Sequence, residues 1–214
     1  RIMHIFNTRM ASGILYELDM RLRPSGNAGL LVVHINTFAK YQEEDAWTWE
    51  HQALVRTRAV YGNKDIKRQF NILRQQILSQ VRDHHELAND VIEMRVKMRS
   101  HLDKSVDSSI DIKQGFGGLV DIEFLAQYLV LKNSHQFGEV AKYSDNVSIF
   151  SQLSAVGVLN LSQQQLLTHA YCQLRDQGHR AALQNEQLLL NGELFKQLTE
   201  DVMIIWQEFL NQVD

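Results

Sequence analysis

The chain has 214 residues, of which 44% are hydrophobic and 22% are charged, and its formal net charge at pH 7 is −3. This composition excludes a disordered chain, a collagen-like repeat and a disulfide scaffold, and the slight acidity argues against a basic face that wraps nucleic acid. Its longest apolar runs, at residues 29–33 and 202–206, fall far short of the roughly 20 residues that cross a bilayer. We therefore expect a globular protein with no nucleic-acid partner and no membrane segment.

The chain contains one cysteine, and it begins at Arg1 rather than at a methionine. A single cysteine cannot form an internal disulfide, which fits the reducing cytoplasm. The apolar helical surroundings of Cys172 predict that its side chain is buried. Since the first residues already have the pattern of an amphipathic helix, we expect the chain to be a fragment of a larger protein whose active site extends upstream.

Proline and glycine are concentrated before residue 119, which predicts mixed helix and strand in the first sixty residues and helices after them. Residues 2–10 have the pattern of a helix that ends at Ser12 and Gly13. Residues 15–23 alternate strictly between apolar and charged side chains, which predicts a strand with one charged face. A turn is expected next, at residues 24–27. Strands are expected at 30–33 and 54–61, and helices between them at 37–42 and 45–53.

Beyond residue 63, apolar residues recur with the helical period of about 3.6. The helices that this pattern predicts lie at 65–80, 87–102, 119–131, 145–156, 163–184 and 193–213. Residues 110–113 have a short strand-like pattern, and a glycine-rich loop at 115–118 follows them. Ser144 or Asp145 is placed to cap one helix and Ser162 the next. The chain is therefore predicted to be an α+β protein that is mostly α-helical.

The charged face of the strand at 15–23 carries Glu17, Asp19, Arg21 and Arg23. Arginines two and four residues beyond Asp19 would keep its carboxylate ionised. Such a carboxylate can ligate Mg²⁺ while the guanidinium groups contact phosphate oxygens. A solvated strand face with ordinary ion pairs is the alternative, because charged side chains usually lie on exposed surfaces.

The glycine-rich loop offers a second candidate site, because a loop that opens a helix presents N–H groups and a positive dipole end to an anion. Lys113 would add a mobile positive charge. The loop is neither a P-loop nor a dinucleotide fingerprint, and a purely structural loop is equally compatible with the pattern. Asp121 and Glu123 would point about 200° apart on the following helix, so that they could not share one metal ion there.

Three long strings, at residues 15–26, 46–56 and 117–124, closely resemble bacterial glutamine synthetase adenylyltransferase. The resemblance extends over essentially the whole chain. Arg-Pro-Ser-Gly, Trp-Thr-Trp-Glu-His-Gln-Ala-Leu and Asp-Ile-Glu-Phe-x-x-Gln-Tyr-Leu-Val-Leu are more similar to the C-terminal, adenylylating half of that enzyme than to its deadenylylating half.

The resemblance implies a polymerase-β-like nucleotidyltransferase, whose site uses a Gly-Ser turn, an Asp-x-Asp pair and a third carboxylate on a following strand. Asp19 matches the third carboxylate, whereas the chain contains no Gly-Ser dipeptide and no Asp-x-Asp. The implied domains are a truncated nucleotidyltransferase domain at 1–62, with a remnant of its sheet, and a helical bundle or regulatory domain at 63–214. The chain by itself is expected to be inactive.

In the intact enzyme, the resemblance implies attack by a tyrosine hydroxyl of glutamine synthetase on the α-phosphorus of MgATP. Asp19 would be the catalytic carboxylate and a ligand of Mg²⁺. Implied phosphate-binding residues are Arg21, Arg23, Arg56 and Lys113; implied site-shaping residues are Asp121 and Glu123. The helical part would bind glutamine synthetase or the signalling protein PII, with glutamine as effector. A purely helical docking module and the deadenylylating half are the alternatives.

Overall fold

The computed structural model describes residues 2–11, 13, 18–20, 23–106 and 109–210. The chain divides into two compact units, Arg1–Ala46 and Trp47–Asp214, and each is described by itself. The elements of the first unit are α1 (Ile2–Asn7), the short 3₁₀ helix η1 (Gly26–Ala28) and α2 (Ile35–Glu44).

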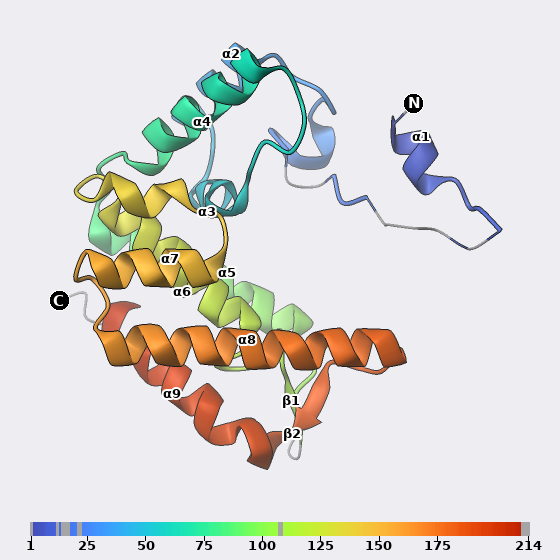
Figure 1. The fold of residues 1–214 in the computed structure, drawn as a ribbon, viewed down its shortest axis with the longest axis vertical. Helices are drawn as coiled ribbons and strands as arrows, with labels where there is room; N and C mark the ends of the chain where they lie inside the picture. Colours follow the sequence, from blue (N-terminus) through green and yellow to red (C-terminus); the bar gives the residue numbers. More distant parts are fainter. Residues whose placement is uncertain (1, 12, 14–17, 21–22, 107–108, 211–214) are drawn as a thin grey trace. The chain divides into compact units, whose positions relative to one another are not determined.

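The second unit contains most of the regular structure (Figure 1). Its elements are α3 (Thr48–Arg56), α4 (Lys64–Leu78), α5 (His84–Leu102), β1 (Ser109–Asp111), α6 (Leu119–Asn133), η2 (Gly138–Lys142), α7 (Asn146–Ala155), α8 (Leu161–Gln184), β2 (Leu189–Asn191) and α9 (Gly192–Leu210). The mostly helical α+β class predicted from the sequence is therefore confirmed, as are the predicted helices of this unit, with ends that differ by a few residues.

Short polar side chains begin four of these helices. Asn63, Asp83, Asp145 and Asn160 each accept a hydrogen bond from a backbone N–H of the first turn, in α4, α5, α7 and α8 respectively. Such caps satisfy donors that have no partner inside the helix. The Glu86 N–H, together with that of His85, lowers the pKa of the Asp83 carboxyl. The prediction for Asp145 is confirmed, whereas Ser162 lies inside α8 because Asn160 caps that helix.

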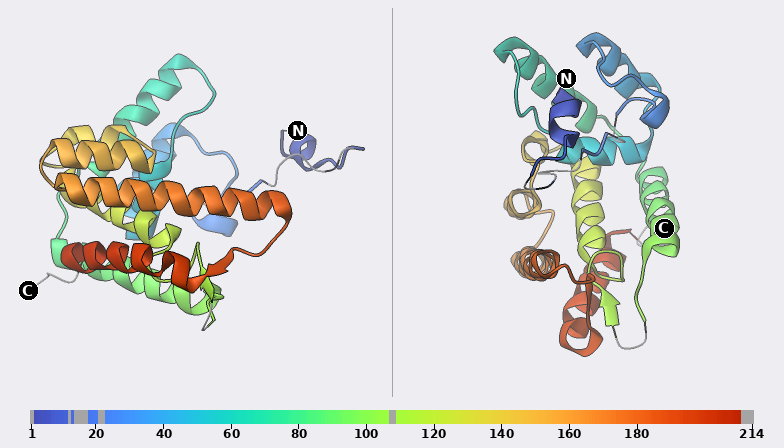
Figure 2. Two further views of the ribbon diagram at one scale, coloured as in Figure 1. Left: turned by 60° about the horizontal axis from the view of Figure 1, so that its bottom comes forward. Right: turned by 90° about the vertical axis from the view of Figure 1, so that its right-hand side faces the viewer.

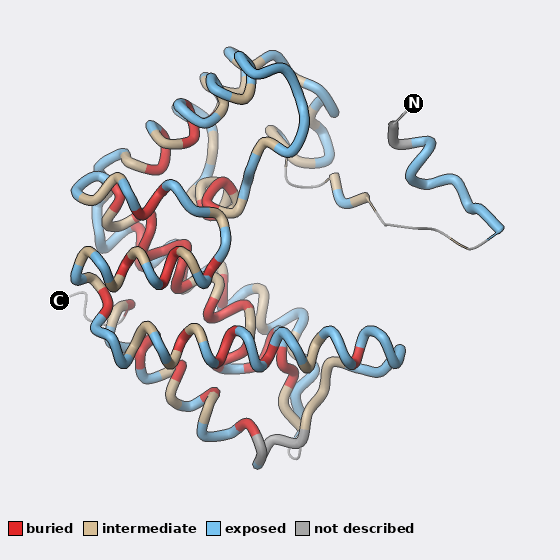
Figure 3. Tube along the Cα trace, viewed as in Figure 1, coloured by how far each residue is buried: buried red, intermediate tan, exposed pale blue. Residues whose placement is uncertain are grey.

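Helix α6 lies at the centre of the second unit. Ten of its fifteen residues are buried, as expected for a helix that is apolar around its whole circumference. It packs against α3, α5, α7, α8 and α9, and Figure 2 shows it between α5 on one side and α7 and α8 on the other. Buried positions accordingly concentrate along α6 and the helix faces turned toward it (Figure 3).

Strands β1 and β2 pair antiparallel, with Ile110 opposite Leu190. This ladder joins the segment before α6 to the segment between α8 and α9. The strand at 110–113 is confirmed over Ser109–Asp111. Strand β2 was not predicted, because three residues with its apolar pattern are too short to distinguish a strand from a helix end.

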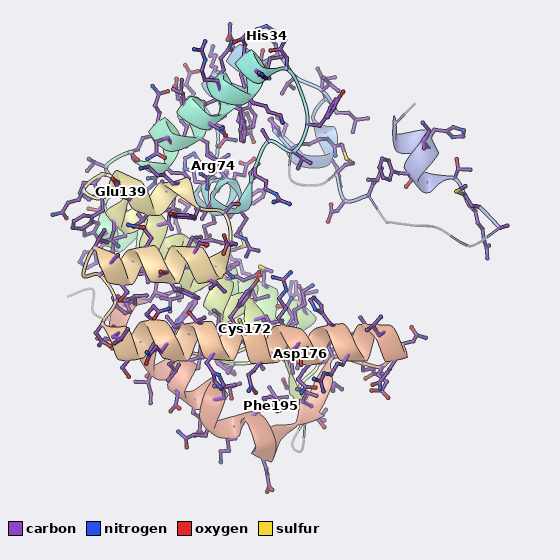
Figure 4. The ribbon with its side chains drawn as sticks, in the orientation of Figure 1. His34, Arg74, Glu139, Cys172, Asp176 and Phe195 are labelled. Atoms are coloured by element: carbon purple, nitrogen blue, oxygen red, sulfur yellow. The ribbon has the colours of Figure 1, made fainter. Side chains whose placement is uncertain are left out.

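Arg74 of α4 ties the end of α3 to η2 (Figure 4). Its buried guanidinium donates to the carbonyls of Leu54 and Tyr143, both at 3.0 Å, and also to those of Val55 and Ala141. These carbonyls lie at the ends of α3 and η2, where helix geometry leaves carbonyls without a full set of partners; that of Leu54 also accepts from the Thr57 N–H at 3.1 Å. Burial lowers the pKa of Arg74 to about 10, so the side chain is still charged at neutral pH. Arg74 is therefore a structural clamp.

Two of the strands predicted near the start of the chain, at 30–33 and 54–61, are not found in the described residues. Residues 30–33 and 57–61 contain no strand, and α3 continues through Arg56. Within the predicted strand at 15–23, residues 18–20 have no regular structure, and residues 15–17 and 21–22 lie outside the described part. An alternating pattern predicts two faces, but a strand also needs a hydrogen-bonded neighbour, and in the described ranges the only ladder of named strands is β1–β2.

Two further expectations concern exposure. Cys172 is exposed on α8 (Figure 4), so the prediction that it is buried is wrong; its helix position faces away from the core that Tyr171 and Leu174 enter. None of the described helices has both the length and the apolar character needed to cross a membrane.

Candidate functional site

The glycine-rich loop before α6 is closed by its own hydrogen bonds. The N–H of Gly115 donates to the Asp111 carbonyl at 2.8 Å, and that of Gly118 donates to the Gly115 carbonyl at 3.0 Å. The N–H of Gly117 donates to Oδ2 of Asp121 at 2.7 Å. The Asp121 carboxylate thus occupies the position that a bound anion would take at this loop. The structure therefore favours the structural interpretation of the loop.

Asp121 lies at the centre of a buried polar group that we call the closed cluster: Asp121, Arg95, Arg99, Gln114 and Gly117. Its carboxylate is fully buried and accepts from Nε of Arg95 and from Nη2 of Arg99, the latter at 2.7 and 2.8 Å. Arg95 also donates to the Gln114 carbonyl at 2.6 Å. Buried ions need such close pairing to offset their lost hydration, although Nε of Arg99 has no partner among the described residues. The closed cluster fixes α5, the loop and α6 together.

Arg99 and Gly117 extend this packing outward. The Arg99 guanidinium lies 3.8 Å from the ring centroid of Phe116, a stacking geometry that stabilises a cation. Gly117 has φ +68°, and a Cβ at this position would lie 2.1 Å from the backbone oxygen of Thr199. The loop therefore requires glycine at this position, because it touches the backbone of α9.

On the other side of α6, Glu123 belongs to a different group, which we call the open cluster: Arg56, Glu123, Asn146, Tyr171 and Arg175. Nη1 of Arg56 donates to Oε1 of Glu123 at 3.0 Å and to Oδ1 of Asn146 at 3.1 Å. The side chains of Arg56 and Glu123 are 31% and 33% exposed, so solvent reaches this pair. Four helices, α3, α6, α7 and α8, contribute to the cluster.

Tyr171 and Arg175 complete the open cluster from α8. Nη1 of Arg175 donates to the Tyr171 hydroxyl at 3.2 Å. Burial lowers the pKa of Arg56, but the Glu123 carboxylate and the adjacent Tyr171 hydroxyl outweigh burial, and the net effect raises that pKa. Arg56 is therefore charged at neutral pH.

The other predicted site residues have separate positions. Asp19 is exposed, in a segment without regular structure in the first unit, and Arg21 lies outside the described residues. Arg23 donates to the carbonyls of Gly29 and Asn27, both at 3.2 Å, and so holds the turn around Pro24. Lys113 is exposed on the turn after β1.

Within the second unit, the structure therefore brings Arg56 and Glu123 together and separates both from Asp121. No three His, Cys, Asp or Glu residues in the described part converge as metal ligands. Sequence reasoning did not find Asn146, Tyr171 and Arg175, because their meeting depends on how α7 and α8 pack. It also did not find Arg95 and Arg99, although two arginines four residues apart on one helix face were a usable signal.

Comparison with known proteins identifies two family models. The model described as glutamate-ammonia ligase adenylyltransferase matches residues 1–73. The model described as GlnD PII-uridylyltransferase matches residues 72–202, which contain both clusters apart from Arg56. The two matches meet within α4, at residues 72–73, and the boundary at 62 between a nucleotidyltransferase and a helical domain stays a prediction.

Curated relatives align with nearly the whole chain. Bifunctional glutamine synthetase adenylyltransferase/adenylyl-removing enzymes are 48% identical in Psychromonas ingrahamii and 51% in Shewanella loihica, in both cases over 99% of this chain. The enzyme of Shewanella oneidensis is 49% identical over 98% of the chain. The chain spans 22% of the length of each of these relatives. With matches of this identity along almost its entire length, the chain belongs to the glutamine synthetase adenylyltransferase family.

Proposed function

We propose that the chain forms part of an enzyme that transfers AMP from ATP to a tyrosine of glutamine synthetase and so regulates nitrogen assimilation in the cytoplasm. The observation that carries the proposal is the alignment, at about half identity, of 99% of the chain with enzymes named for this activity. Those relatives are bifunctional. The Arg-Pro-Ser-Gly and Trp-Thr-Trp-Glu strings support the adenylylating half for this chain.

In this proposal, Asp19 is the third carboxylate of the nucleotidyltransferase site. Its side chain is exposed, and a single carboxylate suits Mg²⁺, which takes oxygen ligands and keeps several positions for water and phosphate. The ion would neutralise charge on the reacting phosphates. Asp19 orients that ion or accepts the proton of the attacking tyrosine, while Arg21, Arg23, Arg56 and Lys113 are the proposed phosphate contacts.

The proposed reaction forms a bond between the tyrosine oxygen and the α-phosphorus of ATP and breaks the bond from that phosphorus to the β-phosphate bridge oxygen. Pyrophosphate leaves, and the tyrosine proton passes to a base. Asp121 and Glu123 are the proposed site-shaping residues, and their contacts differ. Asp121 holds α5 against α6, whereas Glu123 positions the Arg56 guanidinium.

The test of the Asp19 role is Asp19→Ala in a full-length family member, with AMP addition and AMP removal assayed separately. We expect AMP addition to fall by a factor of about 100 or more, as for loss of an essential catalytic group, and AMP removal to be largely spared. Asp45→Ala, at an exposed carboxylate in the same unit, is the matched control and should retain both activities. Addition at the wild-type rate in Asp19→Ala would refute the role, and loss of removal alone would assign the chain to the deadenylylating half.

The 214-residue chain is expected to be inactive on its own, because its sequence has no Gly-Ser dipeptide and no Asp-x-Asp pair. Incubation of the purified chain with glutamine synthetase and ATP labelled at the α-phosphate provides the test. Transfer of label above the background without the chain would contradict this expectation.

A docking role for the helical part is a second proposed function. It is supported by the match of residues 72–202 to the PII-uridylyltransferase family model, since that family acts on PII. We expect the chain to bind PII in a glutamine-dependent manner, and titration of PII into the chain with and without glutamine measures this. Binding of glutamine synthetase but not PII would assign the helices to the substrate instead.

A further inference from the structure

We propose that the open cluster binds the phosphoryl group of a small phosphorylated ligand, with Arg56 and Arg175 as its principal contacts. The proposed function uses Arg56 alone among these residues. Asn146, Tyr171 and Arg175 have no role in it.

The open cluster carries more positive than negative charge. The open cluster contains two guanidinium groups, Arg56 and Arg175, but one carboxylate, Glu123, which is bound to Arg56. The neighbouring Asp176 does not compensate Arg175, because it pairs with Arg180 at 2.8 Å. One positive charge is therefore left without a partner of opposite sign in this group. In the closed cluster the second guanidinium, that of Arg99, shares the Asp121 carboxylate and lies over the Phe116 ring, whereas Arg175 is exposed and has no carboxylate partner in the described part of the chain.

The open cluster also has hydrogen-bond donors that are not fully used. Guanidinium groups only donate hydrogen bonds, so the Tyr171 hydroxyl accepts from Arg175 and keeps its own proton for another acceptor. Asn146 is fully buried, its Oδ1 accepts from Arg56, and its Nδ2 has no partner among the described residues. Buried amide nitrogens without a partner are rare and costly. The donors of the cluster that a ligand can reach are therefore the guanidinium groups of Arg56 and Arg175 and the Tyr171 hydroxyl, while the buried Asn146 Nδ2 holds an unmet donor behind Arg56.

These donors suit a phosphoryl group better than a carboxylate. Two guanidinium groups and a hydroxyl, carried by α3 and α8, offer enough donors for the three oxygens of a tetrahedral group, whereas a carboxylate has only two oxygens in one plane. Arginine is also the residue that most readily forms paired hydrogen bonds with phosphate. Glu123 opposes the binding of an anion at this position, because its carboxylate competes for Arg56. Removal of this carboxylate should therefore strengthen binding.

The test is calorimetric titration of inorganic pyrophosphate into the full chain. We expect saturable binding at concentrations up to about 10 mM. Arg175→Gln should raise the Kd about tenfold, the change expected from losing hydrogen bonds to a charged group. The matched control is Arg180→Gln, an exposed arginine five residues further along α8, which should leave the Kd unchanged.

A second pair of variants tests the competition by Glu123 and the hydrogen bond offered by the Tyr171 hydroxyl. Glu123→Gln should lower the Kd, because Arg56 is released from its competing carboxylate, and Tyr171→Phe should raise it. Thermal unfolding of each variant verifies that the chain remains folded. Equal Kd values for Arg175→Gln and Arg180→Gln would overturn the proposal, as would absence of binding, or succinate binding as tightly as pyrophosphate. Because no AMP transfer is measured, such a failure is distinct from a failure of the proposed function.

Discussion

Helix α6 carries two carboxylates, two residues apart, whose surroundings differ in almost every respect. Asp121 is completely buried and accepts from two arginines and a backbone N–H. Glu123 is one-third exposed and is bound to one arginine. Side chains separated by two positions point to opposite sides of a helix, so one carboxylate faces α5 and the other faces α3.

The difference shows that the number of hydrogen-bond and charge partners of a carboxylate indicates whether it has a structural role or can take part in a binding site. In the closed cluster every oxygen of the carboxylate has a donor, so the cluster has no position for a ligand. In the open cluster the Arg175 charge has no carboxylate partner and the Asn146 Nδ2 has no hydrogen-bond partner within the described chain, whereas in the closed cluster the buried atom without a partner is Nε of Arg99, whose guanidinium is still held by Asp121. Charged residue types alone do not separate the two clusters, since each contains an acid, two arginines and an amide. The comparison therefore predicts large stability effects at Asp121 and small ones at Glu123.

The largest effect is expected for Asp121→Asn, which leaves the buried guanidinium of Arg95 and the partly buried one of Arg99 without their shared carboxylate. Removing one partner of a buried ion pair costs about 3–5 kcal/mol of the free energy of unfolding, a large part of the total for an ordinary domain. Urea denaturation followed by circular dichroism measures the change. The control is Asp176→Asn, whose exposed pair with Arg180 should contribute less than about 1 kcal/mol. Equal costs for the two variants would contradict the closed cluster as described.

Sequence predicted the helices of the second unit because each has an apolar stripe and several have a polar cap, as at Asn63 and Asp83. The strands expected at residues 30–33 and 54–61 fail for a physical reason. An alternating pattern or a short apolar run shows that a segment could form a strand. Whether it does depends on a neighbouring strand to which it can hydrogen-bond, and the local sequence does not contain that information. The β1–β2 ladder shows the converse, since β2 forms with little sequence signal because β1 is available to pair with it.

The candidate site was predictable only in part for the same reason. Arg56 and Glu123 were both singled out from motifs, and the structure places them 3.0 Å apart. Asn146 and Tyr171 lie in segments with ordinary helical patterns, and they reach this pair only through the packing of α7 and α8 on α6. The role of Asp19 remains a prediction.

An intermediate effect is expected for Gly117→Ala, which tests how the loop of the closed cluster is held. The added Cβ meets the Thr199 backbone oxygen at 2.1 Å and also requires a left-handed conformation, so the cost should be about 3 kcal/mol. Gly157→Ala is the matched control, because Gly157 has φ +79° with open space around it, and it should cost about 1 kcal/mol. If the two substitutions cost the same, the loop does not depend on its contact with α9.

The smallest effect is expected for Glu123→Gln, which removes the carboxylate of the open cluster. Partly exposed ion pairs contribute about 0–1 kcal/mol, and glutamine can still accept a hydrogen bond from Arg56, so the free energy of unfolding should change by less than about 1 kcal/mol. The same urea denaturation measures it beside Asp121→Asn. A cost as large as that of Asp121→Asn would show that the two sides of α6 are both structural, and the contrast between a closed and an open cluster would then fail. A small cost combined with tighter pyrophosphate binding leaves Glu123 as a residue that restrains Arg56 rather than one that holds the fold together.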